Sequence, residues 1–383
     1  MNFRLTLILS LLTLAFLPSC GEVEDRVSIT NPSNSHFIGL AEISLSEIKN
    51  NEYENYLVIN EKGDTLASQL SHDNKLLFQV DIKAQSSQSF TLTKGGKHTY
   101  KAKVFGRHYP ERRGDFAWEN DRVGFRFYGK ELKDVQAATS GLDLWYKRTD
   151  RMVLDDWYRK DLSKEASYHV DHGEGCDPYA VGQTLGGGSM AILLDSVLQL
   201  NENFNDFEVL DNGPLRVTFK LDYPTIMLDD QEVKETKTIS LDVGSQLTKI
   251  VQEYTCDKEV MVATGFPKRT QGDSILYTKG QNYFVYQEPE SKENGQIFLG
   301  IIIPEGIDDV YVNQKTMVNN SDKMLTTLPN IVATSKYQPN HPIVYYTGFG
   351  WTKYGFETLS SFEDYLSHFS ASLSEPLRVT YMK

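Results

Sequence analysis

Apolar and polar residues alternate along most of the chain. Apolar side chains take every second position at residues 215–221 and again at residues 78–82. Because successive side chains of a β-strand point to opposite faces of a sheet, a period of two predicts strands with one buried face. Residues 298–303 are apolar throughout and end at Pro304, which predicts a strand buried on both faces. The chain is therefore expected to be mainly β.

Turn residues join several of these strands into hairpins. Residues 61–64 (Glu-Lys-Gly-Asp) separate two apolar segments, and Gly244-Ser245 separate two others. One late segment shows helical spacing instead, with Ser360 or Ser361 as its expected N-cap. Its apolar face is formed by four residues: Phe362, Tyr365, Leu366 and Phe369. We expect this short C-terminal helix to pack against a sheet.

The first residues have the pattern of an export signal. An apolar stretch at residues 5–17 follows a basic start and is too short to span a bilayer as a mature helix, so residues 1–19 are predicted to be a signal peptide. Cys20, directly after Leu-Pro-Ser, resembles the lipidated cysteine of bacterial lipoproteins. We therefore expect a lipid anchor at Cys20 and a linker over residues 20–30. An outer-membrane lipoprotein, facing the cell surface or the periplasm, is the expected location.

The remaining chain is long enough for more than one domain. Glycines end a run of short strands near residues 96–106. We expect a small β-sandwich over residues 31–105 and a large β-sandwich catalytic domain over residues 106–383. Cys176 and Cys256, the cysteines that follow Cys20, are too few to staple so large a chain, so its stability must come from apolar cores.

An arginine cluster stands out in an acidic protein. The net charge is −13, from 39 basic and 52 acidic residues, which argues against a nucleic-acid partner. Arginine binds carboxylate and sulfate bidentately, so the arginines of residues 107–122 predict an anionic substrate, with a surface salt-bridge network as the alternative. Trp351 is a candidate platform for a sugar ring, or else part of a core strand. The other candidate binding residues are Arg107, His108, Arg112, Arg113 and Asn120.

Residues 168–177, here named the histidine loop, concentrate the most chemistry. The loop holds two of the eight histidines, three carboxylates and two glycines. Imidazole and carboxylate groups serve as general acids, general bases and metal ligands. The spacing matches neither a helical zinc motif nor a calcium loop, so we predict acid/base chemistry without a cofactor, and a divalent metal is the alternative. The candidate catalytic residues are His169, His172, Tyr168, Glu174 and Asp171.

Three motifs together resemble a known family. They are Arg-Arg-Gly-Asp-Phe-Ala-Trp-Glu-Asn-Asp-Arg at residues 112–122, the histidine loop, and Gly-Phe-Gly-Trp at residues 348–351. They are similar to those of the ulvan oligosaccharide dehydratases, secreted lipoproteins of polysaccharide-degrading marine Bacteroidetes. The resemblance covers nearly all of the mature chain. It implies a large sandwich like that of the galactose mutarotases, preceded by the small one.

The resemblance also implies a reaction. Water would be removed from the glucuronic or iduronic acid at the non-reducing end of a sulfated ulvan oligosaccharide, which gives a 4,5-unsaturated uronate. His172 or His169 is the expected base at C5, and Tyr168, Tyr179 or the other histidine the expected acid. Two further roles are expected. Arg112, Arg113 and Asn120 would neutralise the carboxylate or hold a sulfate, and Glu174 and Asp171 would orient an imidazole.

Other functional classes remain alternatives. A lyase would cleave a glycosidic bond by the same elimination, and a surface glycan-binding lipoprotein would catalyse nothing. A glycoside hydrolase could draw a carboxylate pair from Asp171, Glu174 and Asp177. All of these alternatives share one predicted partner, an anionic oligosaccharide.

Overall fold

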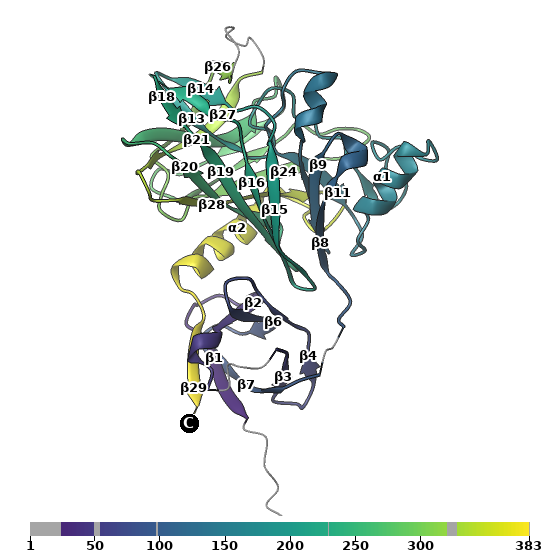
Figure 1. The fold of residues 1–383 in the computed structure, drawn as a ribbon, viewed down its shortest axis with the longest axis vertical. Coiled ribbons are helices and arrows are strands. Elements are labelled where there is room, and N and C mark those ends of the chain that lie inside the picture. The colour runs from purple at the N-terminus through teal and green to yellow at the C-terminus, as the bar shows by residue number, and fades with distance from the viewer. Residues whose placement is uncertain (1–23, 50–53, 97–98, 229, 320–327, 383) are drawn as a thin grey trace, which may run out of the picture.

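The computed structural model describes residues 24–49, 54–96, 99–228, 230–319 and 328–382. Within these ranges the chain forms six sheets and two α-helices, so the mainly β prediction is confirmed. A small sandwich lies at one end and a large sandwich at the other (Figure 1). The predicted signal peptide at residues 1–19 and the lipidation site Cys20 lie outside the described residues.

The small sandwich packs a five-stranded sheet against a three-stranded one. The first has the order β29-β1-β7-β3-β4: Arg378–Met382, Asp25–Asn31, Ser86–Lys94, Tyr56–Asn60 and Thr65–Leu66. The second has the order β2-β6-β5: Phe37–Ser44, Lys75–Ile82 and Ser68–Leu70. The predicted hairpin at residues 61–64 is present, since β3 and β4 pair antiparallel around it. A short 3-10 helix, η1 (Leu45–Glu47), follows β2.

Two boundaries differ from the expected ones. Strand β1 begins at Asp25, inside the segment expected to be linker. Strand β29, at the far end of the expected large domain, instead pairs antiparallel with β1, with Ile29 opposite Val379. The small sandwich is therefore closed by both ends of the described chain.

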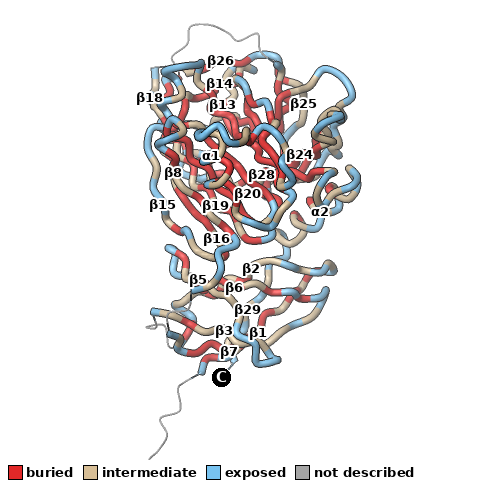
Figure 2. Tube along the Cα trace, turned by 90° about the vertical axis from the view of Figure 1, so that its right-hand side faces the viewer, coloured by how far each residue is buried: buried red, intermediate tan, exposed pale blue. Residues whose placement is uncertain are grey.

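The large sandwich faces an eight-stranded sheet toward a six-stranded one. The first has the order β15-β16-β19-β20-β28-β24-β23-β22: Asp206–Gly213, Arg216–Asp222, Glu235–Asp242, Leu247–Tyr254, Ile343–Trp351, Ile297–Ile302, Tyr283–Gln287 and Ser274–Leu276. The second has the order β25-β27-β21-β13-β14-β26: Asp309–Asn313, Asn330–Tyr337, Val260–Pro267, Met190–Leu194, Val197–Leu200 and Thr316–Val318. A two-stranded ribbon, β17 (Ile226–Leu228) and β18 (Gln231–Val233), lies beside them. One continuous apolar core joins the inner faces, and Figure 2 shows it as buried strands through the large sandwich.

A further five-stranded sheet extends the large sandwich and carries several of the predicted site residues. Its order is β12-β11-β10-β9-β8: Gly175–Cys176, Asp143–Lys147, Gly124–Phe127, Asp115–Asn120 and Val104–Tyr109. Because side chains alternate, Phe116 and Phe125 enter the main core while Arg126 and Asp143 face the other side. Helix α1 (Leu154–Leu162), which the sequence pattern did not predict, covers that other side. Two 3-10 helices lie nearby: η2 (Pro110–Arg112) and η3 (Lys130–Asp134).

The predicted C-terminal helix is present as α2 (Leu359–Ser374). Its Phe362 and Leu366 are buried against the eight-stranded sheet, as expected from the helical spacing. The N-cap differs from both predicted serines: Thr358 caps the helix and Ser361, at the third helical position, closes a capping box with it. None of the helices in the described ranges is long and apolar enough to cross a membrane.

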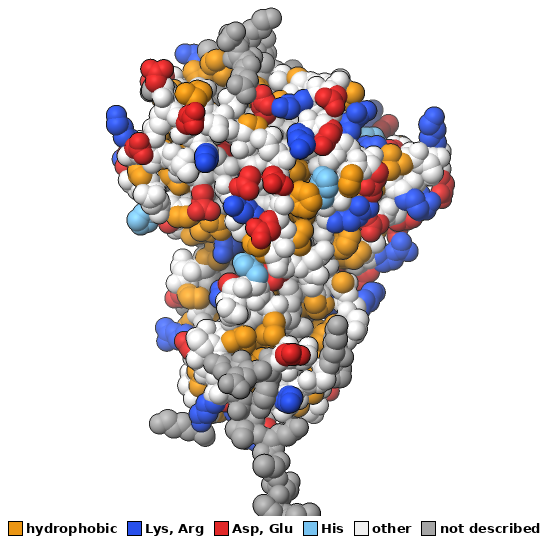
Figure 3. Space-filling view, in the orientation of Figure 1, with side chains coloured by type: hydrophobic (Ala, Val, Ile, Leu, Met, Phe, Trp, Pro, Cys, Tyr) orange, Lys and Arg blue, Asp and Glu red, His pale blue; other side chains and the backbone are white. Residues whose placement is uncertain are grey.

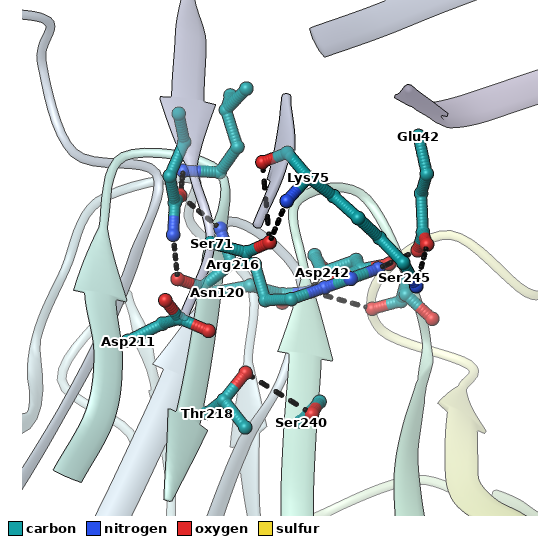
Figure 4. A network of polar contacts seen from close by, with 12 residues as sticks. Glu42, Ser71, Lys75, Asn120, Asp211, Arg216, Thr218, Ser240, Asp242 and Ser245 are labelled. Atoms are coloured by element: carbon teal, nitrogen blue, oxygen red, sulfur yellow. Dashed lines mark hydrogen bonds and ion pairs between the residues drawn. The ribbon is translucent and has the colours of Figure 1, made fainter. Parts of the chain in front are cut away.

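A polar network joins the two sandwiches (Figure 4). Arg216 of β16 pairs with Asp242 at 2.5 Å and with Glu42 of the small sandwich at 2.7 Å. The side-chain amide of Gln69 of β5 forms two hydrogen bonds with the backbone of the large sandwich. It donates to the Arg216 carbonyl at 2.9 Å and accepts from the Leu215 amide at 2.9 Å. These contacts hold the small sandwich against the edge of the eight-stranded sheet.

Candidate functional site

The histidine loop folds back from α1 to the edge strand β12. Gly173 and Gly175 adopt φ values of +107° and +116°, which other residues rarely adopt. At Gly175 a Cβ atom would lie 1.9 Å from the carbonyl oxygen of Tyr146, because the strand pairs there with β11. Glycine at this position therefore allows the loop to close onto the sheet.

The backbone of the loop sets the tautomer of His169. Its Nδ1 atom lies 2.7 Å from the carbonyl oxygen of Asp177. A carbonyl can only accept, so Nδ1 carries the hydrogen and Nε2 is the basic nitrogen. The side chain is 60% exposed. His169 thus presents a basic nitrogen on an exposed side chain.

Tyr168 lies beneath His169, with the two ring centroids 4.4 Å apart. Its ring stacks on Trp145 at 4.8 Å, which fixes the hydroxyl group. Two guanidinium groups donate to that hydroxyl: Arg112 through a short contact, and Arg126 at 3.3 Å. Burial raises the pKa of Tyr168, and the two arginines oppose that rise. The hydroxyl is therefore neutral at physiological pH, and its own hydrogen is not needed for either arginine contact.

Arg126 is buried against Tyr168, and it was not among the residues predicted from the sequence. It pairs with Asp143 at 2.5 Å, with Asp177 at 2.9 Å and with Asp115 at 3.7 Å, all of them buried. Arg126 stands opposite Asp143 in the register of β10 and β11, so the pair is built into the sheet. A signal was present: Arg126 is the one charged residue of a strand that otherwise reads Gly-Phe-Arg-Phe.

Two of the carboxyl groups around Arg126 have raised pKa values. Burial and the neighbouring Asp143 raise the pKa of Asp177 well above its ordinary value, against the opposing effect of Arg126. Burial likewise raises the pKa of Asp115 to about 6. Both groups are therefore harder to ionise than an exposed aspartate. Asp177 is the last residue of the histidine loop, and its Oδ2 atom lies 3.8 Å from His169 Nδ1.

Arg112 links these buried residues to the surface. Its side chain is 26% exposed and pairs with Asp161 at 3.1 Å, while its other terminal nitrogen reaches Tyr168. The structure therefore brings together Tyr168, His169 and Arg112 from the predicted set. Arg126 and Asp177 complete the group, which we name the His169 site.

The remaining loop residues have other partners. Asp171 accepts from the amides of Gly173 and Gly175 and pairs with Arg148, and Glu174 pairs with Arg151 at 3.2 Å. Among the described residues, neither carboxylate is paired with an imidazole, so the structure does not support their expected role of orienting a histidine. The carbonyl of Asp177 does this for His169 instead. The exposed His172 contacts the Ser167 carbonyl at 3.2 Å.

Two predicted binding residues are structural. Asn120 is fully buried, and its amide donates to the carbonyls of Asp242 and Ser245 at 2.6 and 2.7 Å. Trp351 is 2% exposed and donates to the Asn294 carbonyl at 2.5 Å, so its ring faces the core. For Trp351 the alternative, a core strand, is the one that the structure shows, and Asn120 is buried in the same way. A buried strand uses the same aromatic and amide residues as a sugar site.

The other three predicted binding residues have different surroundings. Arg107 pairs with Asp155 and Glu111, and the ring of His108 stacks on Phe207 at 4.4 Å. Arg113 is exposed and holds a left-handed backbone at the end of η2. Figure 3 shows acidic and basic side chains side by side around α1, which fits the ion pair of Arg107 with Asp155.

Helix α1 is fixed by a second buried ion pair. Glu119 of β9 and Lys147 of β11 are both 0% exposed, and Lys147 Nζ lies 2.5 Å from Glu119 Oε2. The same carboxylate accepts from the amides of Val153 and Leu154 at 2.7 and 2.8 Å, at the start of α1. It therefore caps the positive end of the helix, which carries Tyr158 into contact with Tyr168.

The other end of the histidine loop is held by Arg269. This residue, beyond β21, donates to the Ala180 carbonyl at 3.1 Å and pairs with Glu288 at 2.7 Å. Cys176 and Cys256 are both free and buried, and burial raises the pKa of Cys176 to about 12. In the part of the chain that the structure describes, no three histidine, cysteine, aspartate or glutamate side chains are grouped as metal ligands.

Comparisons with known proteins add a family and a fold. The model of a family described as "Domain of unknown function (DUF4861)" matches residues 29–379. A curated protein of Formosa agariphila, named "Uncharacterized protein P7", is 30% identical over 316 residues, which cover 80% of this chain and 77% of that protein. Two solved structures from Enterococcus faecalis match 94% of the chain: an alpha-mannosidase, with a TM-score of 0.54 and 10% identity, and a protein in the glycosyl hydrolase family 38, with 0.50 and 9%. The chain spans 46% and 47% of these two proteins, and at such identity the likeness is one of fold.

Proposed function

The chain belongs to the family of domains described as DUF4861, and we propose that this member is a carbohydrate-active enzyme that performs β-elimination on a uronic acid. The observation that carries the proposal is the His169 site: a basic imidazole nitrogen, a neutral tyrosine hydroxyl and an arginine, all in contact or adjacent. Elimination beside a carboxylate needs these three groups. The fold shared with an alpha-mannosidase supports a carbohydrate substrate.

In the proposed reaction, Nε2 of His169 takes the proton from C5 of the sugar. The electrons of the C5–H bond delocalise into the uronate carboxylate, whose growing negative charge Arg112 stabilises, with Arg126 behind it. The C4–O bond then breaks, and the C4=C5 double bond forms. The leaving oxygen departs as water with the hydrogen of Tyr168. The proton held by His169 afterwards returns to Tyr168 through solvent, so water is the only by-product.

The proposed substrate is a sulfated ulvan oligosaccharide with glucuronic or iduronic acid at its non-reducing end. The resemblance of the 112–122, histidine-loop and 348–351 motifs to ulvan oligosaccharide dehydratases supports this finer assignment. Arg112, which is 26% exposed and donates to the Tyr168 hydroxyl, suits a planar carboxylate. We also propose that the protein acts as an outer-membrane lipoprotein anchored through Cys20, at the cell surface or in the periplasm.

Mass spectrometry of the oligosaccharide after incubation tests the proposal. A dehydratase lowers the mass by one water and leaves the chain length unchanged. Shorter fragments would show a lyase, and an unchanged oligosaccharide that still binds in titration calorimetry would show a binding protein. Either of those results would overturn the dehydratase assignment.

Five variants separate the roles within the site. His169→Gln and Tyr168→Phe should each lower kcat by about 100-fold or more, since each removes a proton-transfer group. His172→Gln is the matched control, because within the described residues the His172 ring is hydrogen-bonded to a backbone carbonyl, and Arg113→Gln is the control for Arg112→Gln. Full activity in His169→Gln, followed by absorbance of the unsaturated product, would remove this histidine from the mechanism.

A further inference from the structure

A third buried ion pair lies inside the large sandwich and shares no residue with the His169 site. Glu235 and Lys237 are on β19, and their side chains are 3% and 1% exposed. They are in direct contact, and both point inward from the eight-stranded sheet, on the same face as Ile239. The pair is neutral overall, so it needs no further counter-ion.

Neighbouring amides satisfy the carboxylate of Glu235. Gln252 donates to Oε1 at 3.2 Å, and Asn201 donates to Oε2 at 2.8 Å. The ammonium group of Lys237 lies 4.0 Å from the ring centroid of Tyr223. Burial lowers the pKa of Lys237, while Glu235 opposes that change. The polar groups around the pair therefore come from several different strands and loops.

Four more polar atoms at this place lack partners. Among the described residues, none forms a hydrogen bond of normal geometry with these atoms: Tyr223 OH, Tyr254 OH, Tyr345 OH and Gln252 Oε1. All four are buried, and the polar groups that act on the Tyr345 hydroxyl are the Glu235 carboxylate and the backbone of Met190. Buried hydroxyl and amide oxygens in native proteins are almost always hydrogen-bonded, so a group of four calls for a physical explanation.

The sheet register brings these atoms together. Tyr254 lies opposite Glu235, Gln252 lies opposite Lys237, and Tyr345 lies opposite Ile250 on the next strand. The backbone amide of Tyr223 donates to the Glu235 carbonyl at 3.1 Å. Because residues two apart share a face, the side chains of Gln252, Tyr254 and Tyr345 point to the same side of the sheet as the ion pair.

We propose that this region is a closed hydrated chamber, in which internal water molecules bridge the three tyrosine hydroxyls, Gln252 and the Glu235–Lys237 pair. An internal water makes about three hydrogen bonds, so four atoms and the remaining ammonium hydrogens need about two waters. The lining residues are buried, which leaves no entrance for a sugar. This chamber is separate from the His169 site and does not depend on the proposed reaction.

A high-resolution crystal structure of the wild-type protein tests the chamber directly. We expect ordered water peaks within hydrogen-bond distance of at least two of the four atoms. A dry interior at this place would overturn the proposal, and so would a single peak with the anomalous signal of a halide.

Water relaxation dispersion tests the same proposal in solution, because internal waters exchange far more slowly than surface waters. Tyr254→Phe and Tyr345→Phe should each reduce the long-lived water signal and lower the thermal midpoint. Tyr346→Phe is the matched control: this tyrosine follows Tyr345 on β28 but points to the opposite face, where it packs on Phe369. A signal that is equal in wild type and in all three variants would contradict the hydrated chamber.

Discussion

The ion pair beneath α1 allows a sharp test of how the His169 site is supported. In Lys147→Met the ammonium is lost, while the aliphatic volume is nearly kept. Glu119 then remains at 0% exposure, and its remaining partners among the described residues are the Val153 and Leu154 amides. Removing one partner of a fully buried pair costs about 3–5 kcal/mol, against a total stability of about 5–15 kcal/mol for a typical domain.

The double variant Glu119→Gln/Lys147→Met isolates the cause. A glutamine oxygen can still accept from the two amides at the start of α1, and no buried charge is left. We therefore expect the double variant to recover most of the loss, about 2 kcal/mol or more relative to Lys147→Met. Such recovery would show that the unpaired carboxylate, and not lost packing, is the source of the damage.

Urea unfolding followed by tryptophan fluorescence is the suitable assay. The protein has four tryptophans, and all of them are buried within the large sandwich and its α1 region. The signal therefore follows that region without a contribution from the small sandwich. Trp145 and Trp157 stack at 5.6 Å beside the ion pair, so they also report local release of α1.

Two results would refute the reasoning. A loss below about 1 kcal/mol in Lys147→Met would mean that Glu119 is protonated or hydrated without its partner. A double variant no more stable than Lys147→Met would mean that the methionine packs badly. If the reasoning holds, Lys147→Met should also lower the activity of the His169 site, since Tyr158 of α1 packs against Tyr168.

Three further predictions address the site itself. Arg112→Lys keeps the charge but cannot reach both Asp161 and Tyr168, so kcat/KM should fall by about 10-fold or more, whereas the exposed control Arg113→Lys should be unaffected; equal losses would contradict this. In Asp115→Asn the pH dependence of the free energy of unfolding should change. Because the pKa of Asp115 is raised to about 6 in the folded protein, its protonated form stabilises the protein at low pH. That contribution is lost as the pH rises through about 6. The free energies of unfolding of the two proteins, measured in urea, should therefore agree near about pH 4. Near about pH 8 the variant should be more stable by up to about 3 kcal/mol, and a difference that does not vary with pH would refute the assignment. Gly175→Ala should abolish activity and Gly173→Ala should not, because both glycines have positive φ but only at Gly175 does a Cβ meet the Tyr146 carbonyl; equal kinetics in the two variants would show that the loop can shift.

Much of the fold followed from local patterns. The alternation at residues 215–221 appears in the structure as β16, and the turn at Gly244-Ser245 joins β19 to β20. Such elements are predictable because a half-buried strand and a tight turn each impose a local rule on the sequence.

Helix α1 was not predictable for a physical reason. It has nine residues, and only Leu154, Trp157 and Tyr158 are buried. Its N-cap residue is Val153, which has no capping side chain, and the cap comes from Glu119 of a distant strand. A long-range cap leaves no signal in the neighbouring sequence.

The site was only partly predictable, because its chemistry depends on which groups become buried together. The histidine loop was the segment predicted to carry the site, and the structure brings its Tyr168 and His169 to Arg112. No sequence pattern separates Asp171, which pairs with Arg148, from Asp177, which reaches Arg126. That distinction arises from the sheet register, which no local pattern contains.

The pairing of β29 with β1 has a consequence for the order of folding. Strand β1 of the small sandwich must wait for its partner β29, which is synthesised after the whole large sandwich. Until then, the edge of β1 stays open to other strands. Contacts between residues so distant in sequence form slowly, so the N-terminal sandwich is the last part of this protein to be completed. A chain truncated before Arg378 should therefore keep its large sandwich but leave this edge open to aggregation.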